Sequence, residues 1–426
     1  MSVLLLPNCC FLSESSRMLE LHRAFDALGV PAVSATHGGS FGRVYDDAGV
    51  ELLRLGEITP ERQREMVASV PGMKGPDSDM WTPAELRAQV EAELGLIERL
   101  SPRVLVTGWT LSALISSKVA GIPLVTEHAG LWLPPLWENN RAPVPSKKPN
   151  LLLSLLPPAM AVRGFNQRVP RIRWYLDAVN QVCREYGVEE LPSFAAMVMG
   201  DLSLVMEVPE VFGSTRDEIQ AWRPQHPEAY RAGARLAYGG PLFAKLAMEV
   251  PDRVDAFLER RPVYVAMTST PPETIKAVVA ALRPLGLPLL VSGAGHDLSS
   301  IEAPDVMVEE LLPNHLVVPR TRLMVAAGGH GSLQTALASG VPFLGIPLQP
   351  EQDTNIVLAE RQGAARRVAL KHAGSPRLTR VARELLDDPS YRANAQRLAA
   401  IYASVDGAAV SAHVITEFAG ITHART

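Results

Sequence analysis

Short apolar runs alternate with helix-like segments along this chain, and this alternation limits the possible folds more than any other feature. The first run, VLLL, begins at Val3, and in the segment after it Met18, Leu21, Phe25 and Leu28 recur at helical spacing. The runs RVLVTG and IPLVTEH repeat the pattern further along the chain. Because strands that alternate with helices build a parallel sheet covered on both faces, an α/β fold is expected.

The second half of the chain shows the same alternation, from PVYVAMTST to VPFLGIPL. At 426 residues the chain is also too long for one compact core, so two domains are expected. A polar, irregular segment that ends in Gly239-Gly240-Pro241 separates the two series. We therefore expect one Rossmann-like domain over residues 1–237 and a second over residues 238–426. The last helical stretch, residues 408–418, could pack on either domain.

The composition, 47% hydrophobic and 20% charged, is that of an ordinary globular protein. A net charge of -4 argues against a nucleic-acid partner, which normally requires a basic face. Cys9 and Cys10 are adjacent and Cys183 is distant, so the cysteines form no disulfide framework. The start, MSVLLLPNCC, lacks the pattern of a signal peptide, and no apolar run approaches the roughly 20 residues of a membrane span. A cytoplasmic location is expected.

One apolar segment, LLLSLLPPAMAV from Leu151, lies among the basic residues Lys147, Lys148, Arg163 and Arg168. Such a segment could contact a membrane surface or an oily ligand. Its prolines, however, are expected to spoil the amphipathic helix that a membrane-binding segment uses. A buried or lid-like segment is therefore the simpler interpretation.

A glycine-rich turn follows an apolar run in the second half. In LMVAAGGHGSLQ, Gly328, Gly329 and Gly331 stand where the strand gives way to a helix expected to begin near Ser332. Glycine lets the backbone approach a ligand closely, and the free N–H groups of a helix start bind phosphate. The turn therefore predicts a phosphate site.

A polar cluster, QPEQDTN, follows the next strand and includes Glu351 and Gln352. Carboxylate and amide side chains together are suited to binding hydroxyl groups. Thr268, Ser269 and Thr270 close a third strand and could donate to the same phosphates. Although an ordinary βαβ turn with polar strand ends would look similar, the two clusters together suggest a sugar nucleotide.

These features resemble the donor domain of the family-one glycosyltransferases, most of all the bacterial macrolide and natural-product type. The matching pieces are YGGPL, PVYVAMTST, ELLP, MGDLSLVMEVPEVF and PRTRLMVAAGGHGSLQTALASGVPFLGIPLQPEQDTNIVLAERQGA. They cover most of the second half, whereas the first half matches more loosely, through topology and AGIPLV. The resemblance implies a GT-B fold, in which two Rossmann-like domains face each other across a cleft. It also implies a donor site in the second domain, an acceptor site in the first, and no metal.

The resemblance assigns roles to particular residues of the second half. The amides of the glycine turn, with Ser269, would face the diphosphate. Glu351 and Gln352 would face the sugar hydroxyls, and Leu311 and Leu312 would contact the nucleobase of the donor. The expected donor-site residues are Ser269, Thr270, Leu311, Leu312, Gly328, Gly329, His330, Gly331, Ser332, Glu351 and Gln352. The family usually carries a phosphate-binding histidine before the glycine pair, but Ala327 stands there. His330 could take over that contact.

The catalytic base is the second departure from the family. The family uses a histidine before the first helix, and here that position falls on Glu14, while the partner aspartate falls near Gly108. A base needs a pKa near the working pH, and a carboxylate in the first turn of a helix should be a weaker base. His37 and His128, expected at strand ends on the same edge, are the other candidates. The base is left unassigned among these three.

We expect an enzyme that transfers a sugar, with inversion, from a UDP- or dTDP-sugar to a small hydrophobic or aromatic acceptor, without a further cofactor. The acceptor would contact Trp109, Glu127, His128, Trp132 and Trp137 of the first domain, together with the proline-rich segment between Leu131 and Met160. A catalytically degenerate GT-B protein that binds a nucleotide or partners an enzyme is the alternative. A dinucleotide fingerprint is disfavoured, because GGHGSLQ departs from G-x-G-x-x-G at its last position. Monomer and homodimer both remain open.

Overall fold

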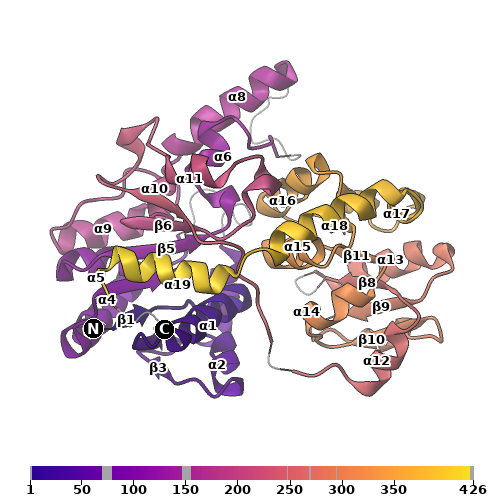
Figure 1. Ribbon diagram of the computed structural model, residues 1–426, viewed down its shortest axis with the longest axis horizontal. Helices are drawn as coiled ribbons and strands as arrows, with labels where there is room; N and C mark the ends of the chain where they lie inside the picture. Colours follow the sequence, from indigo (N-terminus) through magenta and orange to yellow (C-terminus); the bar gives the residue numbers. More distant parts are fainter. Residues whose placement is uncertain are drawn as a thin grey trace. The chain divides into compact units, whose positions relative to one another are not determined.

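The computed structural model describes residues 2–69, 79–145, 155–246, 248–267, 270–293 and 295–422. The chain forms two compact units (Figure 1). The first comprises Met1–Ala142, Leu151–Ala244 and Val405–Thr426, and the second comprises Pro143–Asn150 and Lys245–Ser404. The long segments of the two units meet between residues 244 and 245, a few residues from the expected boundary at 237 and 238, and residues 143–150 and 405–426 belong to the opposite unit from their neighbours in the sequence.

The first unit is built on a sheet of seven parallel strands in the order β3-β2-β1-β4-β5-β6-β7. Its strands are β1 (Val3–Leu5), β2 (Ala32–Thr36), β3 (Leu52–Arg54), β4 (Val104–Thr107), β5 (Leu124–His128), β6 (Leu202–Val205) and β7 (Arg235–Tyr238). Its helices are α1 (Leu12–Ala27), α2 (Arg43–Asp47), α3 (Pro60–Ala68), α4 (Pro83–Leu100), α5 (Ala113–Ala120), α6 (Pro134–Glu138), α8 (Pro158–Arg168), α9 (Asp177–Glu185), α10 (Phe194–Met197), α11 (Arg216–Gln220) and α19 (Gly407–Phe418).

The second unit has a parallel sheet of six strands in the order β10-β9-β8-β11-β12-β13. Its strands are β8 (Val263–Ala266), β9 (Leu289–Ser292), β10 (Val306–Glu309), β11 (Leu323–Ala326), β12 (Phe343–Gly345) and β13 (Ala365–Arg367). Its helices are α12 (Asp252–Leu258), α13 (Pro272–Leu282), α14 (Asn314–Val317), α15 (His330–Ala338), α16 (Pro350–Arg361), α17 (Pro376–Asp387) and α18 (Pro389–Ala403). The two Rossmann-like units confirm the expected α/β fold class.

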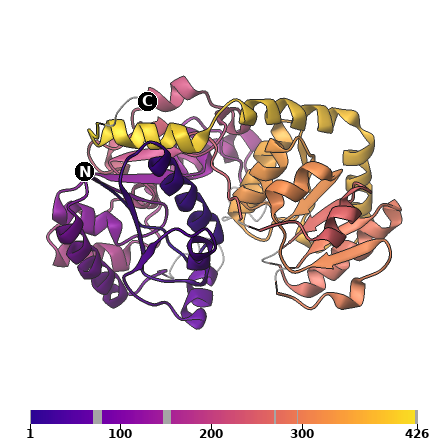
Figure 2. The ribbon, with the colours of Figure 1, turned by 60° about the horizontal axis from the view of Figure 1, so that its bottom comes forward.

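Helices cover both faces of each sheet, which explains why the central strands read as unbroken apolar runs. Strands β1, β4, β8 and β11 are buried along their whole length. In the first unit α1 and α19 pack together over the sheet, and α19 contributes Ala412 and Ile415 to that core (Figure 2). The last helical stretch thus packs on the first unit.

The order of the strands decides which turns lie together. β1 pairs with β4, and β4 with β5, so the turns at Asn8, Gly108 and His128 share one edge of the first sheet. β8 and β12 both pair with β11, so the turns after these strands share one edge of the second sheet. Ligands of open parallel sheets bind at this carboxyl edge.

Within the described part of the chain, no single helix is long and apolar enough to cross a membrane. The pair α18 and α19, which has a break between its members, passes the same test by length and composition alone.

Candidate functional site

The glycine turn of the second unit joins β11 to α15. Gly328 has a φ of +94°, and a Cβ there would lie 2.5 Å from the side chain of Ile356, so only glycine fits. Helix α15 begins at His330, earlier than the expected start near Ser332. Gly331 and Ser332 therefore lie in the first turn of the helix, where backbone N–H groups have no partner within the helix.

Gly329 and Gly331 differ from Gly328 in a way that bears on function. Gly329 has a φ of −58°, and Gly331 is an exposed helical residue, so neither needs glycine for its backbone conformation. A Cβ added to either would meet nothing within 4 Å. The protein itself leaves both positions open, and a ligand that approaches the start of α15 would find room there.

Glu351 lies beside this helix start. Its carboxylate accepts a hydrogen bond from Asn355 Nδ2 at 2.7 Å and another from the backbone N–H of His330. Burial raises the pKa of Glu351, while these hydrogen bonds and the nearby His330 act in the opposite direction. A carboxylate thus stands at the positive end of α15, next to the open glycines.

Asn355 is a residue whose role the sequence did not assign. Its Nδ2 donates to the carbonyl oxygen of Gly328 at 3.0 Å as well as to Glu351. This buried amide therefore ties the glycine turn to the polar cluster on α16. The only available signal was its place in QPEQDTN, four residues after Glu351, which is one helical turn.

The other residues of the cluster are engaged elsewhere. Gln352, expected at the sugar hydroxyls, uses its Oε1 to accept the backbone N–H of Leu348 at 2.8 Å. Asp353 forms an ion pair with Arg367. Of this cluster, Glu351 and Asn355 are thus the side chains that contact the glycine turn and the start of α15.

The strand next to β11 adds a second polar group. Thr270 follows β8 and is 1% exposed, and its Oγ1 has no hydrogen-bond partner among the described residues. A buried hydroxyl without a partner is costly, so a ligand or water is expected to complete it. Ser269 lies outside the described residues. Of the two leucines expected to contact the nucleobase of the donor, Leu311 is half-buried and Leu312 is buried.

The second unit also has a groove of about 660 Å³, away from the glycine turn. Its lining includes Arg261, two residues before β8, and Arg322, directly before β11. It therefore lies at the amino ends of the strands, opposite the glycine turn, and is not the expected donor site.

In the first unit, Glu14 lies in the first turn of α1, the helix that follows β1. It is 1% exposed, and its Oε1 accepts backbone N–H groups from Trp109 at 2.8 Å, Asn8 at 3.1 Å and Gly108 at 3.2 Å. Its Oε2 is buried and has no partner in the described part of the chain. Glu14 thus keeps one oxygen free while the other is held.

The expected effect of the helix start on Glu14 was wrong in direction. Burial, and then the nearby charge of Glu127, raise the pKa of Glu14 to about 7, although two backbone N–H groups and Arg17 oppose this. Glu14 does lie in the first turn of α1, but the loss of water outweighs the favourable helix end. The result is a carboxyl group that exchanges protons near neutral pH.

Gly108 allows the two carboxylates to come together. A Cβ at this position would lie 2.9 Å from Glu14 Cδ and 3.0 Å from Glu127 Oε1. Arg17 donates to the Glu127 carboxylate from Nε at 2.8 Å and from Nη2 at 2.7 Å. At Gly108, where the resemblance placed a partner acid, the nearby carboxylates are thus those of Glu14 and Glu127.

His128 follows Glu127 at the end of β5. Burial, followed by the positive charge of Arg17, lowers the pKa of His128 to about 3, so the ring is neutral at pH 7. Its Nε2 is buried without a partner in the described residues, while the ring hydrogen-bonds to the backbone of Val198. A base with so low a pKa takes up a proton poorly, which favours Glu14.

His37 is held by a separate buried network. Its Nε2 lies 2.7 Å from Glu93 Oε1, and Ser112 and Ser116 donate to the same carboxylate. Both His37 and Glu93 are buried. Its role as a base stays a prediction, which this engagement makes less favourable.

Aromatic side chains line the same edge of the first sheet. Trp109 packs edge-on against His128 at 5.6 Å and against Trp132 at 5.7 Å between ring centroids. Trp109 and Trp132 are half-exposed, whereas Trp137 is 4% exposed and donates its Nε1 to Tyr230. Trp137 was wrongly expected at the acceptor, because it belongs to the protein core.

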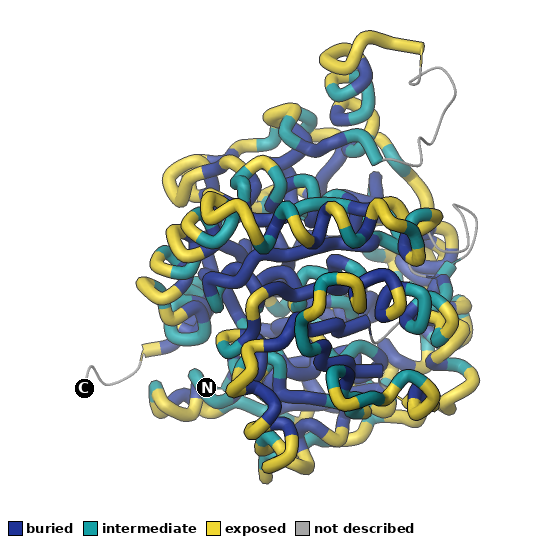
Figure 3. Tube along the Cα trace, turned by 90° about the vertical axis from the view of Figure 1, so that its right-hand side faces the viewer, coloured by how far each residue is buried: buried dark blue, intermediate teal, exposed yellow. Residues whose placement is uncertain are grey.

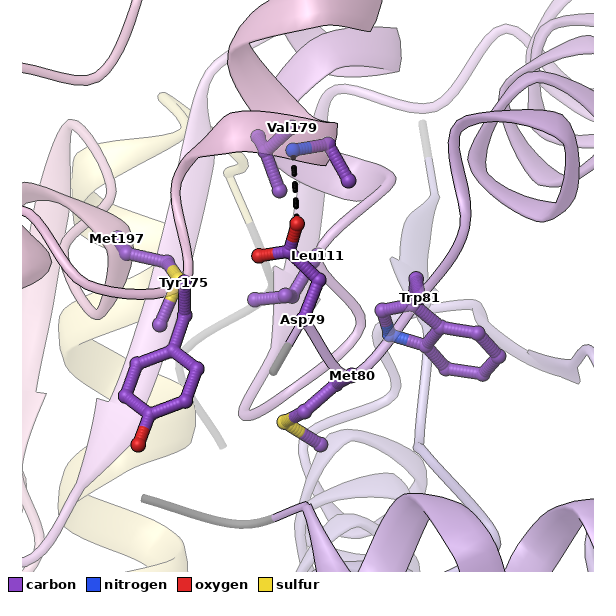
Figure 4. A pocket seen from close by; sticks show the side chains of 8 residues that line it. Asp79, Met80, Trp81, Leu111, Tyr175, Val179 and Met197 are labelled. Atoms are coloured by element: carbon purple, nitrogen blue, oxygen red, sulfur yellow. Dashed lines mark hydrogen bonds between the residues drawn. The ribbon is translucent and has the colours of Figure 1, made fainter. Parts of the chain in front are cut away.

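A narrow pocket lies near this edge, between Asp79, Leu111 and Val179 (Figure 4). Asp79 Oδ2 accepts the backbone N–H of Ala178 at 3.1 Å there. The pocket has no room for a water molecule, so it is a gap in the packing and not a ligand site.

Comparison with known proteins gives consistent matches. Residues 248–406 match the family described as UDP-glucoronosyl and UDP-glucosyl transferase. The chain is 26% identical over 329 residues to the PGL/p-HBAD biosynthesis rhamnosyltransferase of Mycobacterium bovis, covering 74% of this chain and 67% of that protein.

Solved structures extend the similarity to the whole fold. The glycosyltransferase VinC, solved in complex with dTDP, has a TM-score of 0.68 and 16% identity, covering 99% of this chain and 100% of VinC. The spinosyn rhamnosyltransferase SpnG, solved with the spinosyn aglycone, has a TM-score of 0.65 and 18% identity, covering 97% of this chain and 100% of SpnG. These matches confirm the GT-B fold.

Proposed function

We propose that this chain, a nucleotide-sugar-dependent glycosyltransferase by its family match and fold, moves a sugar from a UDP- or dTDP-sugar to a small hydrophobic or aromatic acceptor. The transfer is a direct displacement with inversion. The acceptor oxygen bonds to the anomeric carbon, the bond from that carbon to the diphosphate breaks, and the acceptor proton passes to a base.

The donor binds at the glycine turn of the second unit. The observation that carries this assignment is that Gly329 and Gly331 stand open at the start of α15, although neither the backbone nor the packing requires glycine there. The N–H groups of this helix start stabilise the charge that grows on the leaving diphosphate. The Thr270 hydroxyl, buried without a partner among the described residues, donates to the same group.

Glu351 contacts the sugar hydroxyls of the donor. Its carboxylate is held at the start of α15 by Asn355, so it is already oriented before the donor arrives. A negative carboxylate would repel the diphosphate, but it accepts hydrogen bonds from sugar hydroxyls. Glu351 lies beside the open glycines and not on them, so the glycine turn can bind the diphosphate while Glu351 binds the sugar.

Glu14 is the base in this proposal. Its pKa of about 7 lets it hold or release a proton at working pH, and its Oε2 is the oxygen free to accept one. Burial, followed by the nearby charge of Glu127, keeps the pKa of Glu14 high, and Arg17 holds Glu127 in place beside it. Trp109 and Trp132 offer a half-exposed aromatic wall for an apolar acceptor.

The test is a transfer assay with UDP- and dTDP-sugars and a panel of phenolic and macrolide acceptors. We expect release of the nucleoside diphosphate that depends on the acceptor, together with an equal amount of glycosylated product. Gly329→Val, which places a branched side chain in the open space at the helix start, should abolish both. A native protein that binds the nucleotide but transfers to no acceptor would favour the non-catalytic alternative.

A further inference from the structure

Exposed apolar side chains are concentrated in one stretch of the first unit, on and next to α8. Seven large hydrophobic side chains are exposed in the described part of the chain, and four of them lie between residues 155 and 174. They are Leu155 at 75%, Leu156 at 39%, Met160 at 57% and Trp174 at 45% exposed. Large exposed apolar patches mark sites of contact with another protein or a membrane, so we expect this surface to bind a partner.

The same surface is basic. Arg163, Arg168, Arg171 and Arg173 are exposed, and none of them forms an ion pair with a described residue. The sequence from 139 to 176 contains no Asp or Glu, in a chain whose net charge is -4. We call these four arginines and the four apolar residues the α8 surface.

Helix α8 presents this surface on a fixed support. On its inner side Asn166 is 1% exposed and bonds to both the N–H and the carbonyl oxygen of Ala142, at 3.2 and 2.8 Å. On its outer side Met160, Arg163 and Gln167 are exposed and follow one another at helical spacing. Figure 3 shows how exposed and buried positions are distributed along the trace. The exposed face is thus a feature of an anchored helix.

The prolines of this segment do not break the helix, contrary to the expectation from sequence. α8 begins at Pro158, the first helical position, where proline is well tolerated, and continues for 11 residues. Residues 155–160 are all exposed, so a buried segment is ruled out for them, while the start of the run, residues 151–154, lies outside the described residues. A lid-like segment and a membrane-binding surface both remain compatible with this exposure.

We propose that the α8 surface docks the protein on an anionic lipid membrane. Leu155, Leu156 and Met160 enter the headgroup region, and Trp174 lies at the boundary between apolar and polar layers. The four arginines attract the negative headgroups, which explains why no acidic residue stands among them. If the proposed function holds, docking brings the acceptor unit close to acceptors dissolved in the membrane.

The test is co-sedimentation of the full chain with vesicles. We expect binding to vesicles of equimolar phosphatidylglycerol and phosphatidylcholine at low salt, and little binding to phosphatidylcholine alone. Reversing two charges, in Arg168→Glu/Arg171→Glu, should weaken binding by at least about thirtyfold. Leu155→Ser/Leu156→Ser should weaken it while leaving the melting temperature unchanged, because both residues are exposed.

Matched controls lie on the second unit. Arg377→Glu/Arg380→Glu reverses two exposed charges of α17, and Leu370→Ser removes an exposed leucine, so both should bind vesicles like the native chain. Absence of vesicle binding, or equal losses in the control variants, would overturn the proposal. Because the experiment measures vesicle binding, it tests membrane docking independently of transferase activity.

Discussion

Replacing Glu14 by glutamine should remove a pH-dependent cost from folding and also slow the transfer reaction. Gln keeps an oxygen for the three N–H groups of Asn8, Gly108 and Trp109, and it places an amide beside Glu127. The shape of the site is therefore retained while the titrating group is lost.

The magnitude follows from the pKa of Glu14, raised by burial from an ordinary 4.5 to about 7. The folded state then binds more protons than the unfolded state between these values, so this group's effect on stability becomes more unfavourable as the pH rises. Above pH 7 the full cost is present, about 3 kcal/mol. Between about pH 5.5 and about pH 8.5 the cost grows by about 2 kcal/mol.

Urea unfolding of the native chain and of Glu14→Gln at these two pH values measures the effect. The variant should gain about 2 kcal/mol relative to the native chain on going to the higher pH. Glu98→Gln, which changes an exposed glutamate of α4, should show no such gain. A stability difference that is the same at both pH values would refute the raised pKa.

The same variant tests the role of Glu14 as the base. General-base catalysis contributes about 10² to 10⁴ in rate, so the transfer rate should fall by that factor. A lost pH dependence of stability with an unchanged transfer rate would leave Glu14 as a buried structural group and remove it from the mechanism.

Four further variants probe the two units. Gly331→Ala should keep or slightly raise the melting temperature but weaken nucleotide binding. Gly328→Ala should lower the free energy of unfolding by roughly 1–3 kcal/mol, because Gly328 has a positive φ and an added Cβ would contact Ile356. Thermal melts with and without UDP separate the two effects. Trp132→Ala should raise the KM for the acceptor far more than it affects donor hydrolysis, and equal losses in both would contradict an aromatic acceptor wall. Asn355→Ala should lower the free energy of unfolding by about 2 kcal/mol, because the carbonyl oxygen of Gly328 and the carboxylate of Glu351 lose their shared hydrogen-bond donor. Urea unfolding measures this loss.

Local patterns in the sequence predicted the fold and the glycine turn. Apolar runs and helical spacing depend on neighbouring residues, so the parallel strands and the strand-to-helix turn at Gly328 followed directly from them. The proximity of QPEQDTN to that turn also followed, because β11 and β12 are adjacent parallel strands.

Properties that depend on distant residues could not be predicted in this way. The pKa of Glu14 is set by burial and by Glu127, which reaches Glu14 only through the pairing of β1, β4 and β5. The burial of Trp137 depends on Tyr230, far along the chain. The prolines before α8 were misjudged because the sequence did not reveal that the helix starts at Pro158.

The most direct test of the central claim is a thermal-shift titration with UDP, dTDP, GDP and NAD, on the native chain and on Gly329→Val. A ligand at about 100 times its Kd stabilises the folded state by roughly 2.7 kcal/mol, which a melt resolves easily. The account predicts a rise in melting temperature with UDP or dTDP that disappears in the variant, and no rise with NAD. A native protein that melts unchanged with every nucleoside diphosphate, or a variant that responds like the native chain, would contradict a donor site at the start of α15.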